Sequence, residues 1–403
     1  MIYYFKCINY RPIAIATAIS KIFELVILSK CENYIQSCDN QFGFKKKHST
    51  DLCIFVLKDV LNYFNRMGSP VFTVFIDLKK AYDRVNHSKL FRKLIKRGVP
   101  LYIVKFLAYW YSHQQLQVRW GNTCSEAFHV TNGIRQGGLV SAALFSLYIE
   151  DLSGQLNGSR VGCRVGSEVI CHLAYADDIV LLAPSPKALK VLLKLCDKYA
   201  SLFDIVYNTD KTLCMIFWPK RWKFIFTPVF KLQGDVLKYV KDFKYLGFII
   251  SNDTKDNLEI YKRTGKMYAT GNMIIAKFKN CHNLCKTIMF KTYCTNVYAC
   301  ALWANYSVAA YQRMRVAYNN IFRLLLNVRR GPDHSISALF VQHQVNDFES
   351  VMRVSVNSLM RRVLDSTNRL VVALRESSAR LHSTLWHRWA IVLRRDADQE
   401  LLV

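Results

Sequence analysis

Two apolar stretches that run into carboxylates constrain the fold of this chain more than any other feature. Val71–Ile76 is β-branched and aromatic and leads directly into Asp77, which predicts a buried strand that ends at an acid. Much later in the chain, apolar runs flank Asp177 and Asp178 on both sides, which predicts a hairpin with acidic residues at its tip. If these strands are neighbours in one sheet, the three acids converge.

Converging carboxylates repel one another unless a cation holds them. Hard oxygen ligands with no His or Cys nearby favour Mg2+. Two such ions, about 3.5–4 Å apart, stabilise the attacking and the leaving oxygen of an in-line phosphoryl displacement. Taken singly, each Asp is more often a turn cap or the partner of a lysine than a metal ligand. The joint pattern favours the metal site.

The charge balance predicts a polyanionic partner. The 403 residues carry 56 Lys and Arg against 29 Asp and Glu, a formal charge of +27, which is typical of proteins that bind nucleic acid. Residues 220–345 hold 20 of the basic and 6 of the acidic residues, so we expect this third of the chain to lie along the polyanion. With 51% apolar and 13% aromatic residues, the chain is expected to fold.

Composition also bears on location and on the cysteines. Charges interrupt every apolar run before it reaches the roughly 18 residues of a membrane span, and the N-terminus has no secretory pattern. We therefore expect an intracellular protein of the nucleus or the cytoplasm, with no membrane partner. The 13 cysteines are expected to be reduced thiols. Cys281, His282 and Cys285, with Cys294 and Cys300 further on, come nearest to a zinc site, but a helical core is the favoured interpretation.

Periodicity places the other elements and predicts an α+β fold. The first forty residues are expected to be largely helical, from the apolar spacing after Pro12. Further helices are expected over 87–96, 101–112, 139–156 and 187–206, and most of the chain beyond Asn252 is expected to be helical. Strands are expected over 115–120, 126–131, 168–175, 179–182 and 213–217.

Three blocks in a fixed order carry a family resemblance. They are Phe75-Ile-Asp-Leu-Lys-Lys-Ala-Tyr-Asp83, Gly133-Ile-Arg-Gln-Gly-Gly-Leu-Val-Ser141 and Tyr175-Ala-Asp-Asp178. Together they resemble the reverse transcriptases of non-LTR (LINE-type) retrotransposons. Shorter matches extend the resemblance over about residues 9–250, and more loosely to about Arg330: Asn9–Ile13, Gln41–Lys45, Asn208–Thr212 and Phe243–Gly247.

The resemblance implies roles for individual residues. Asp77 and Asp177 match metal-binding acids, Asp178 matches a supporting acid, and Leu78 matches a residue that offers its backbone carbonyl to a metal. The implied cofactor is a pair of Mg2+ ions, with Mn2+ as a substitute. The residues that match nucleotide-binding positions are Lys45, Tyr82, Gln136, Gly137 and Lys211. Among them, Tyr82 matches the ring that excludes a ribose 2′-hydroxyl; ordinary aromatic packing is the alternative.

Primer and template contacts are implied for a second group. Tyr175 ends the strand before the acidic pair, and Tyr245 and Gly247 match a turn that grips the primer end, for which a β-turn packed on the sheet is the alternative. Lys262, Arg263 and Lys266 fall on one face of a predicted helix, where they are expected to follow phosphates. Ser141 is followed by Ala142, where the family often has proline, which leaves the helix start there in question.

A right-hand polymerase is the architecture that the resemblance implies. Its fingers are expected over 1–70 and, with part of the palm, over 86–128. The palm, an antiparallel sheet with backing helices, is expected over 71–85 and 129–217. A primer-grip connection is expected over 218–251 and a helical thumb over 252–345. Residues 346–403 are expected to form a helical extension of unknown role. This segment is expected either to cap the thumb or to be sequence unrelated to the family.

RNA-directed DNA synthesis during retrotransposon copying is the implied activity. Its partners are an RNA template, a DNA primer and deoxynucleoside triphosphates. Since few residues precede Tyr10, the upstream endonuclease domain of such elements is expected to be absent. Two alternatives remain open: a truncated, inactive remnant that only binds nucleic acid, and a structural nucleic-acid-binding protein that uses the basic helices alone.

Overall fold

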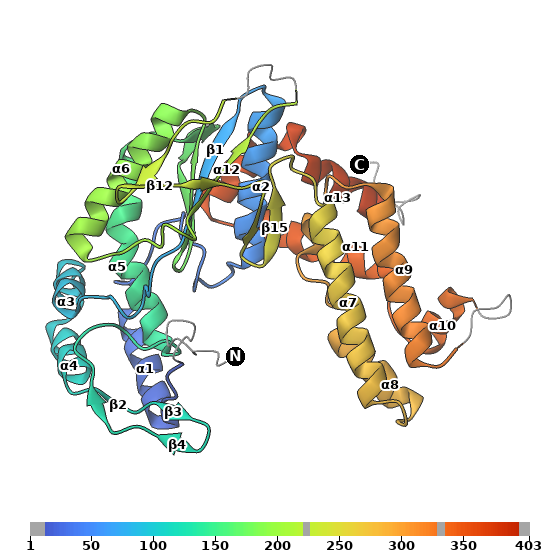
Figure 1. The fold of residues 1–403 in the computed structure, drawn as a ribbon, viewed down its shortest axis with the longest axis horizontal. Coiled ribbons are helices and arrows are strands. Elements are labelled where there is room, and N and C mark those ends of the chain that lie inside the picture. The colour runs from blue at the N-terminus through green and yellow to red at the C-terminus, as the bar shows by residue number, and fades with distance from the viewer. Residues whose placement is uncertain (1–12, 221–225, 329–334, 395–403) are drawn as a thin grey trace, which may run out of the picture.

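The chain is described by a computed structural model over residues 13–220, 226–328 and 335–394. Of the predicted motif at 9–13, all but Ile13 lies outside these residues. Two arms extend from a central sheet (Figure 1). The N-terminal arm comprises helices and small strands within residues 18–31 and 87–129, and the C-terminal arm comprises the helices within residues 257–342. The sheet and its covering helices connect the arms.

A five-stranded sheet forms the centre, in the order β13-β10-β1-β9-β8. Its strands are β1 (Val71–Ile76), β8 (His172–Tyr175), β9 (Asp178–Ala183), β10 (Leu213–Phe217) and β13 (Lys238–Tyr239). β1 is antiparallel to both neighbours, and only the β10–β13 pair is parallel. The two-residue strands β11 (Lys231–Leu232) and β12 (Asp235–Val236) form a separate hairpin, as do β6 (Cys163–Val165) and β7 (Glu168–Ile170). The predicted α+β class is confirmed.

Both faces of β1 are buried, since alternate side chains of a strand point to opposite faces. Val71 and Phe75 belong to a core shared with α2 (Thr50–Arg66). Phe72, Val74 and Ile76 belong to a second core, shared with α5 (Leu139–Gly158) and α6 (Pro186–Phe203). Complete burial explains why this strand is apolar except at Thr73, whose hydroxyl donates to the carbonyl of Met215 at 3.0 Å.

The N-terminal arm differs from its prediction in two places. Within the described part of the first forty residues, from Ile13 on, the expected helix is α1 (Ala18–Cys31) alone, beginning where the side chain of Thr17 accepts from the amide of Ser20. The strands expected over 115–120 and 126–131 are shorter: β2 (Gln115–Leu116) pairs with β5 (Phe128–His129), and β3 (Arg119–Trp120) with β4 (Thr123–Cys124). Because β3 and β4 are exposed on both faces, no core extends the ladder. α3 (His87–Lys96) and α4 (Leu101–Ser112) have their predicted bounds.

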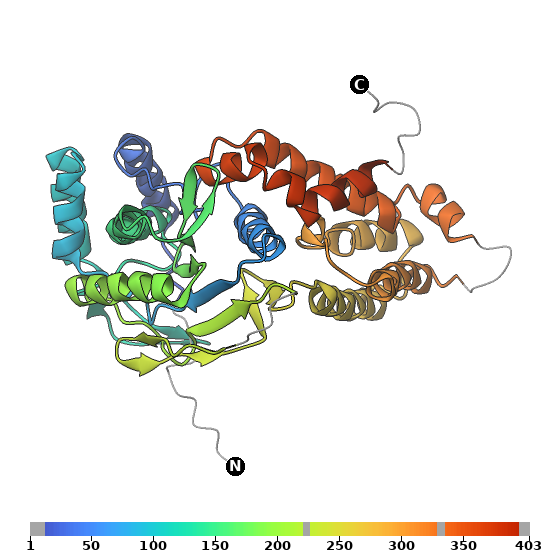
Figure 2. The ribbon, with the colours of Figure 1, turned by 90° about the horizontal axis from the view of Figure 1, so that it is seen from above.

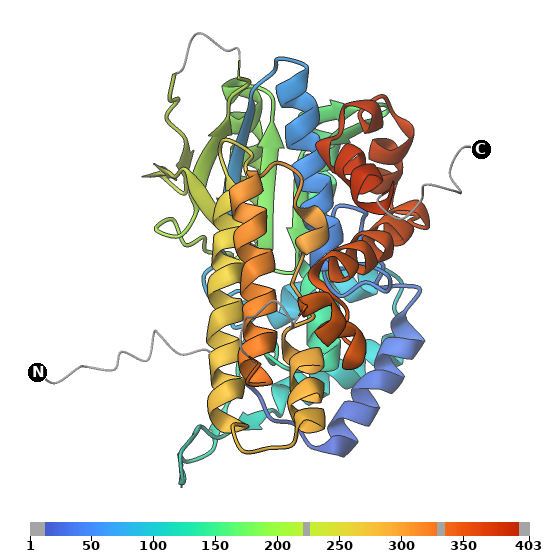
Figure 3. The same ribbon diagram turned by 90° about the vertical axis from the view of Figure 1, so that its right-hand side faces the viewer.

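The C-terminal arm follows the hairpin β14 (Asp242–Tyr245) and β15 (Phe248–Ser251). It consists of α7 (Asn257–Lys277), α8 (Asn283–Tyr293), α9 (Val308–Leu325) and α10 (Ile336–Gln342), with the short helix η2 (Cys300–Leu302) before α9. α7 and α9 lie side by side (Figure 3). They approach closely because Gly271 has no side chain: a Cβ there would lie 2.5 Å from Ile321. The predicted helical character of this part is confirmed.

The segment after the C-terminal arm returns to the centre of the molecule. It contains α11 (Phe348–Leu364), α12 (Arg369–Glu376), η3 (Arg380–His382) and α13 (Thr384–Arg394). Its helices pack beside α2 (Figure 2), where the ring of Trp389 stacks on Phe55 with centroids 5.6 Å apart. The indole of Trp389 also donates to the carbonyl of Ala301 at 2.7 Å. This segment therefore shares one core with α2 and with the C-terminal arm.

The cysteines of the described residues are all free, and most are buried. Cys124 in β4 and Cys281 between α7 and α8 are exposed, whereas Cys294 and Cys300 are buried in the core. His282 caps α8 by accepting from the amide of Leu284. Within the same residues, no group of three or more His, Cys, Asp or Glu is placed to hold a metal. No helix there is long and apolar enough to cross a bilayer.

Candidate active site

The structure brings Asp77 and the Asp177–Asp178 pair to the same end of the sheet. Ile76 pairs with Ile179 across β1 and β9, so Asp77, which follows Ile76, and Asp178, which precedes Ile179, end neighbouring strands on the same side. Both acids line a cavity of about 380 Å³. The predicted convergence of these two acids is thus present in the fold.

The cavity draws on segments that are far apart in sequence. Its lining residues are Phe75, Ile76, Asp77, Asp178, Ile179, Asp210, Lys211, Leu213, Phe243, Lys244 and Tyr245. Lys211 supplies a positive charge beside the two acids, and Lys244 supplies another. Of the residues implied by the resemblance, Asp77, Asp178, Lys211 and Tyr245 meet here.

The backbone around Asp77 is held by residues 206–212. The Asn208 amide donates to the Asp77 carbonyl at 2.8 Å, and the Asp77 amide donates to the hydroxyl of buried Thr212 at 3.2 Å. Leu78 bridges to Tyr207 in the same antiparallel pairing. The hydrogen bonds of that bridge use the carbonyl of Asp77 and the amide of Lys79, not the carbonyl of Leu78.

The turn that carries the acidic pair has an unusual backbone. Ala176 adopts a left-handed conformation, with φ of 57°, which costs a non-glycine residue roughly 1 kcal/mol or more. Asp177 is half-buried and Asp178 is exposed. Tyr175, half-buried at the end of β8, has its pKa raised by burial.

Tyr82 lies close enough to Asp177 for the carboxylate charge to affect the pKa of the Tyr82 hydroxyl. Its ring stacks on Phe145 with centroids 4.8 Å apart and planes 17° from parallel. Burial, with a further contribution from Asp177, raises the pKa of Tyr82 to about 12. The carbonyl of Tyr82 accepts from the amide of Ile134 at 2.9 Å, which ties the first block to the second.

Gln136 and Gly137 form a turn just before α5. The carbonyl of Gln136 accepts from the amide of Ala14 at 2.8 Å. Gly137 has φ of 106°, a conformation that strongly favours glycine, and a Cβ there would lie 3.1 Å from the carbonyl oxygen of Ala14, a tight contact. α5 begins at Leu139 without a proline, because the buried carboxylate of Glu24 accepts from the Leu139 and Val140 amides.

Lys45 lies away from the cavity, on the loop before α2. Its ammonium donates to the carbonyl of Cys38 at 2.7 Å and is 4.0 Å from the carboxylate of Asp39. Burial lowers the pKa of Lys45, against the charges of Asp39, Cys38 and Glu150, which raise it. The same loop, through Gln41 and Gly43, contacts the turn that carries the acidic pair.

The β14–β15 turn is bound to the start of α7. Leu246 and Gly247 both have positive φ, 46° and 85°, as a tight hairpin requires. The Tyr298 hydroxyl donates to the Leu246 carbonyl at 2.6 Å. Lys262 and Arg263 each donate to the Gly247 carbonyl at 2.7 Å.

The basic residues of α7 therefore differ in their surroundings. Arg263 is buried and also pairs with Glu259, which is 0% exposed, and Lys262 pairs with the same carboxylate at 3.3 Å. Lys266 is exposed.

Tyr245 at the end of β14 is buried, and its hydroxyl lies 3.4 Å from the Cys53 sulfur. Burial raises the pKa of Tyr245 well above the usual value.

Comparison with known proteins gives the family. The sequence profile described as "Reverse transcriptase (RNA-dependent DNA polymerase)" matches residues 6–250. The chain belongs to the reverse transcriptase family. All three blocks that carried the resemblance lie within the matched residues, so the predicted family is confirmed.

Several curated relatives of this reverse transcriptase chain come from mobile elements. The probable RNA-directed DNA polymerase from transposon BS of Drosophila melanogaster is 24% identical over 333 residues, 79% of this chain and 36% of that protein. A Pol polyprotein from a type-2 retrotransposable element of the same organism is 26% identical over 206 residues, 50% of this chain and 19% of the relative. The chain thus spans well under half the length of these relatives.

The solved structures that resemble this chain in part include two telomerases. Telomerase from Candida tropicalis in complex with a fragment of telomeric RNA has a TM-score of 0.46 at 11% identity, covering 96% of this chain and 55% of that one. Telomerase from Candida albicans, also with a telomeric RNA fragment, has a TM-score of 0.45 at 11% identity, covering 96% and 59%.

Sequence reasoning assigned no role to two residues of this reverse transcriptase site. Gln41 holds the turn before Asp177, and Thr212 holds the amide of Asp77. Both lie inside short motifs that the family resemblance had already marked. Motif membership was the available signal, but the partner of each side chain is more than 130 positions away in the chain.

Proposed function

We propose that this chain is an RNA-directed DNA polymerase that adds deoxynucleotides to a primer 3′-end during the copying of a retrotransposon. The observation that carries the proposal is the meeting of Asp77, Asp178 and Lys211 at one cavity. Two carboxylates and an ammonium supply both kinds of charge that nucleotidyl transfer needs, for metal ions and for a leaving pyrophosphate. Family membership supports the same reaction class.

The acids would hold two Mg2+ ions, or Mn2+ in their place. The donors fit, because Mg2+ in proteins is bound through one or two carboxylates together with substrate phosphates and water rather than by a complete protein cage. Asp77, Asp177 and Asp178 would supply the carboxylates, and Leu78 a backbone carbonyl. Bound there, the ions would activate the primer 3′-hydroxyl and stabilise the charge on the leaving pyrophosphate.

Other residues would bind and orient the substrates. Lys211 would neutralise the developing charge on the pyrophosphate from its side of the cavity. Tyr82 would lie beneath the incoming sugar, and Gln136 and Gly137 would lie against the base pair. Lys45 would contact the triphosphate once its ammonium leaves the carbonyl of Cys38.

The two arms would hold the nucleic acid in a right-hand arrangement. The central sheet with α5 and α6 would be the palm, the N-terminal arm the fingers, and the C-terminal arm the thumb. The sequence assigned α2 to the fingers, but α2 shares a core with β1, so we assign it to the palm. An RNA template paired to a DNA primer would pass between them, with Tyr175, the β14–β15 turn and exposed Lys266 on the side of the primer and template. The basic balance of residues 220–345 supports this placement.

Primer extension tests the proposal directly. Purified protein with a poly(rA) template, an oligo(dT) primer, dTTP and Mg2+ is expected to extend the primer. Asp177→Asn is expected to abolish extension while duplex binding, measured by fluorescence anisotropy, stays unchanged. Duplex binding without extension by the intact chain would instead favour the inactive remnant.

A further inference from the structure

The turn that carries the acidic pair is held by a side chain from a distant loop. Gln41 is buried, with 1% of its surface exposed. Its carbonyl oxygen accepts from the amide of Ala176 at 2.9 Å, and its amide nitrogen lies 3.5 Å from the carbonyl of Ala176. One side chain therefore contacts both polar groups of the residue whose left-handed backbone lies directly before Asp177.

Close packing of Gly43 reinforces this contact. A Cβ at Gly43 would lie 2.6 Å from the amide nitrogen of Ala176 and 3.2 Å from the carbonyl carbon of Tyr175. The backbone amide of Gly43 also donates to the same side-chain oxygen of Gln41, Oε1, at 2.9 Å. The loop thus lies directly against the turn, with no room for a side chain between them.

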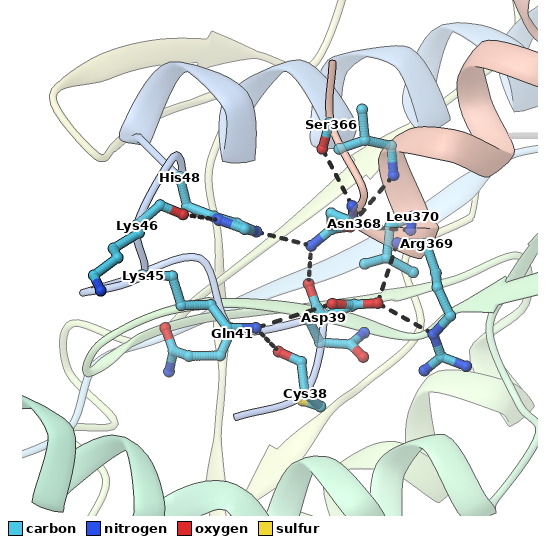
Figure 4. A network of polar contacts seen from close by, with 12 residues as sticks. Cys38, Asp39, Gln41, Lys45, Lys46, His48, Ser366, Asn368, Arg369 and Leu370 are labelled. Carbon is cyan, nitrogen blue, oxygen red and sulfur yellow. Dashed lines mark hydrogen bonds and ion pairs between the residues drawn. The ribbon is translucent and has the colours of Figure 1, made fainter. Parts of the chain in front are cut away.

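The same loop is fastened on its other side by the start of α12 (Figure 4) and, further along, by α11. Asn368, which caps α12, donates to the Asp39 carbonyl at 2.7 Å, and the Arg369 side chain donates to the Asp39 carboxylate at 3.2 Å. Nearby, Arg362 of α11 pairs with the carboxylate of Asp51 at 2.5 Å. Residues 38–51 are therefore held between the C-terminal helices and the acidic turn.

We propose that Gln41 is a positioning residue for Asp177 and Asp178, and that α11 and α12 support it through residues 38–51. This inference rests on the proposed polymerase function. The left-handed backbone of Ala176 is unfavourable in free energy for a residue with a side chain. The hydrogen bonds from Gln41 therefore stabilise the turn conformation in which the acidic pair lies beside Asp77. The C-terminal helices, for which the sequence predicts no role, thereby act on the site without touching it.

The first test compares two neighbouring buried amides. Asn40 packs in the same loop and donates to the His172 carbonyl at 2.8 Å, but it does not touch the turn. Gln41→Ala is expected to lower kcat for primer extension about 10- to 100-fold, raise the Mg2+ concentration needed for half-maximal rate severalfold, and leave KM for dTTP unchanged. Asn40→Ala is expected to change the melting temperature similarly without shifting the Mg2+ requirement.

Hydrogen exchange supplies a readout that does not depend on activity. Peptides covering residues 173–178 are expected to exchange faster in Gln41→Ala and in Asn368→Ala. Asn62→Ala is the control for the second variant, because Asn62 also ties the C-terminal helices to the centre, through Thr384 at 2.9 Å, but not through the loop. Unchanged exchange in Asn368→Ala would overturn the supporting role of α12.

Steric disruption gives an independent variant. Gly43→Ala is expected to shift the Mg2+ requirement as Gln41→Ala does, whereas Gly154→Ala, where a Cβ meets nothing within 4 Å, is expected to have no effect. If Gln41→Ala and Asn40→Ala lose activity in parallel with an unchanged Mg2+ requirement, the positioning role is wrong. If the wild-type chain extends no primer but Gln41→Ala still speeds hydrogen exchange in residues 173–178, the proposed polymerase function is wrong. The structural role of Gln41 in holding the turn would then remain supported.

Discussion

Arg263 donates a hydrogen bond to the carbonyl of Gly247, 2.7 Å away, from the second turn of α7. The guanidinium also pairs with the buried carboxylate of Glu259 and lies over the ring of Tyr298, 4.7 Å from its centroid. The base of the C-terminal arm is thereby fixed to the β14–β15 turn beside the cavity. A buried ion pair that also holds a backbone carbonyl has a structural role in addition to any contact with phosphate.

Removing this guanidinium is expected to destabilise the fold. Arg263→Ala leaves the buried carboxylate of Glu259 with the Lys262 ammonium and the Ile249 amide as partners but without its guanidinium, and breaking a buried pair in this way costs about 3 kcal/mol or more. Urea denaturation of the two proteins measures the difference in the free energy of unfolding. Lys266→Ala is the matched variant: since Lys266 is exposed, its loss is expected to leave stability unchanged and to lower the salt slope of duplex binding by about one. Equal stabilities for both variants would contradict this role of Arg263.

Lys211 is expected to act in the chemical step. Lys211→Ala is expected to lower kcat for primer extension about 100-fold, because the variant would lose the positive charge that the proposed mechanism places beside the leaving pyrophosphate, and Lys211→Arg is expected to recover part of the rate. Single-turnover kinetics measure the step. Lys238→Ala serves as control, since Lys238 is 71% exposed and pairs with Asp210 at the rim; a comparable loss there would indicate a general effect of charge.

Sugar discrimination tests the position of Tyr82. Tyr82→Ala is expected to raise the relative kcat/KM for ribonucleotides at least about tenfold, because the ring stacked on Phe145 would no longer exclude a 2′-hydroxyl. Competition between dTTP and UTP on the same primer measures the ratio. Tyr82→Phe keeps the ring and is expected to retain discrimination. Unchanged discrimination in both variants would leave aromatic packing as the role of Tyr82.

Buried Asp59 is expected to make the stability of the fold depend on pH. Burial raises the pKa of Asp59 from 3.8 to about 7, against the Ser383 hydrogen bond and the charges of Arg66 and Lys58, which lower it. At pH values between these two pKa values, the Asp59 carboxyl is ionised in the unfolded chain but still protonated in the folded chain. The free energy of unfolding therefore decreases as the pH rises across this range. Asp59→Asn is expected to remove this loss. Melting temperatures of both proteins at pH 5 and pH 8 measure it; an equal drop in both would exclude Asp59 as its source.

Local pattern was sufficient for much of the fold. β1, β10, α3 and α4 have their predicted bounds, because a continuous apolar run or a helical period marks each of them. The meeting of Asp77 with Asp178 was also predicted, since acids that end apolar strands can come together only if those strands are neighbours. The antiparallel sheet then places both on the same side.

Long-range polar contacts could not be predicted in this way. Gln41 bonds to Ala176, and Asn368 to Asp39, across more than 130 residues with no repeating spacing to mark either pair. The spacing of Lys262, Arg263 and Lys266 on one helical face predicted three phosphate contacts, but spacing gives no information on which residue faces the protein. Burial of Arg263 depends on Glu259, Gly247 and Tyr298, which only the tertiary structure brings together.

Each of the two arms carries an exposed cysteine to which a dye can be attached. Cys124 on the N-terminal arm and Cys281 on the C-terminal arm are exposed, while burial raises the pKa of Cys53, Cys196 and Cys214 to about 12 and so suppresses their reactive thiolates. With Cys7, which lies outside the described residues, and the half-buried Cys38 and Cys285 replaced by serine, maleimide dyes would attach mainly at Cys124 and Cys281. Energy transfer between the dyes would then report, in single molecules, whether the arms approach each other as each nucleotide is added.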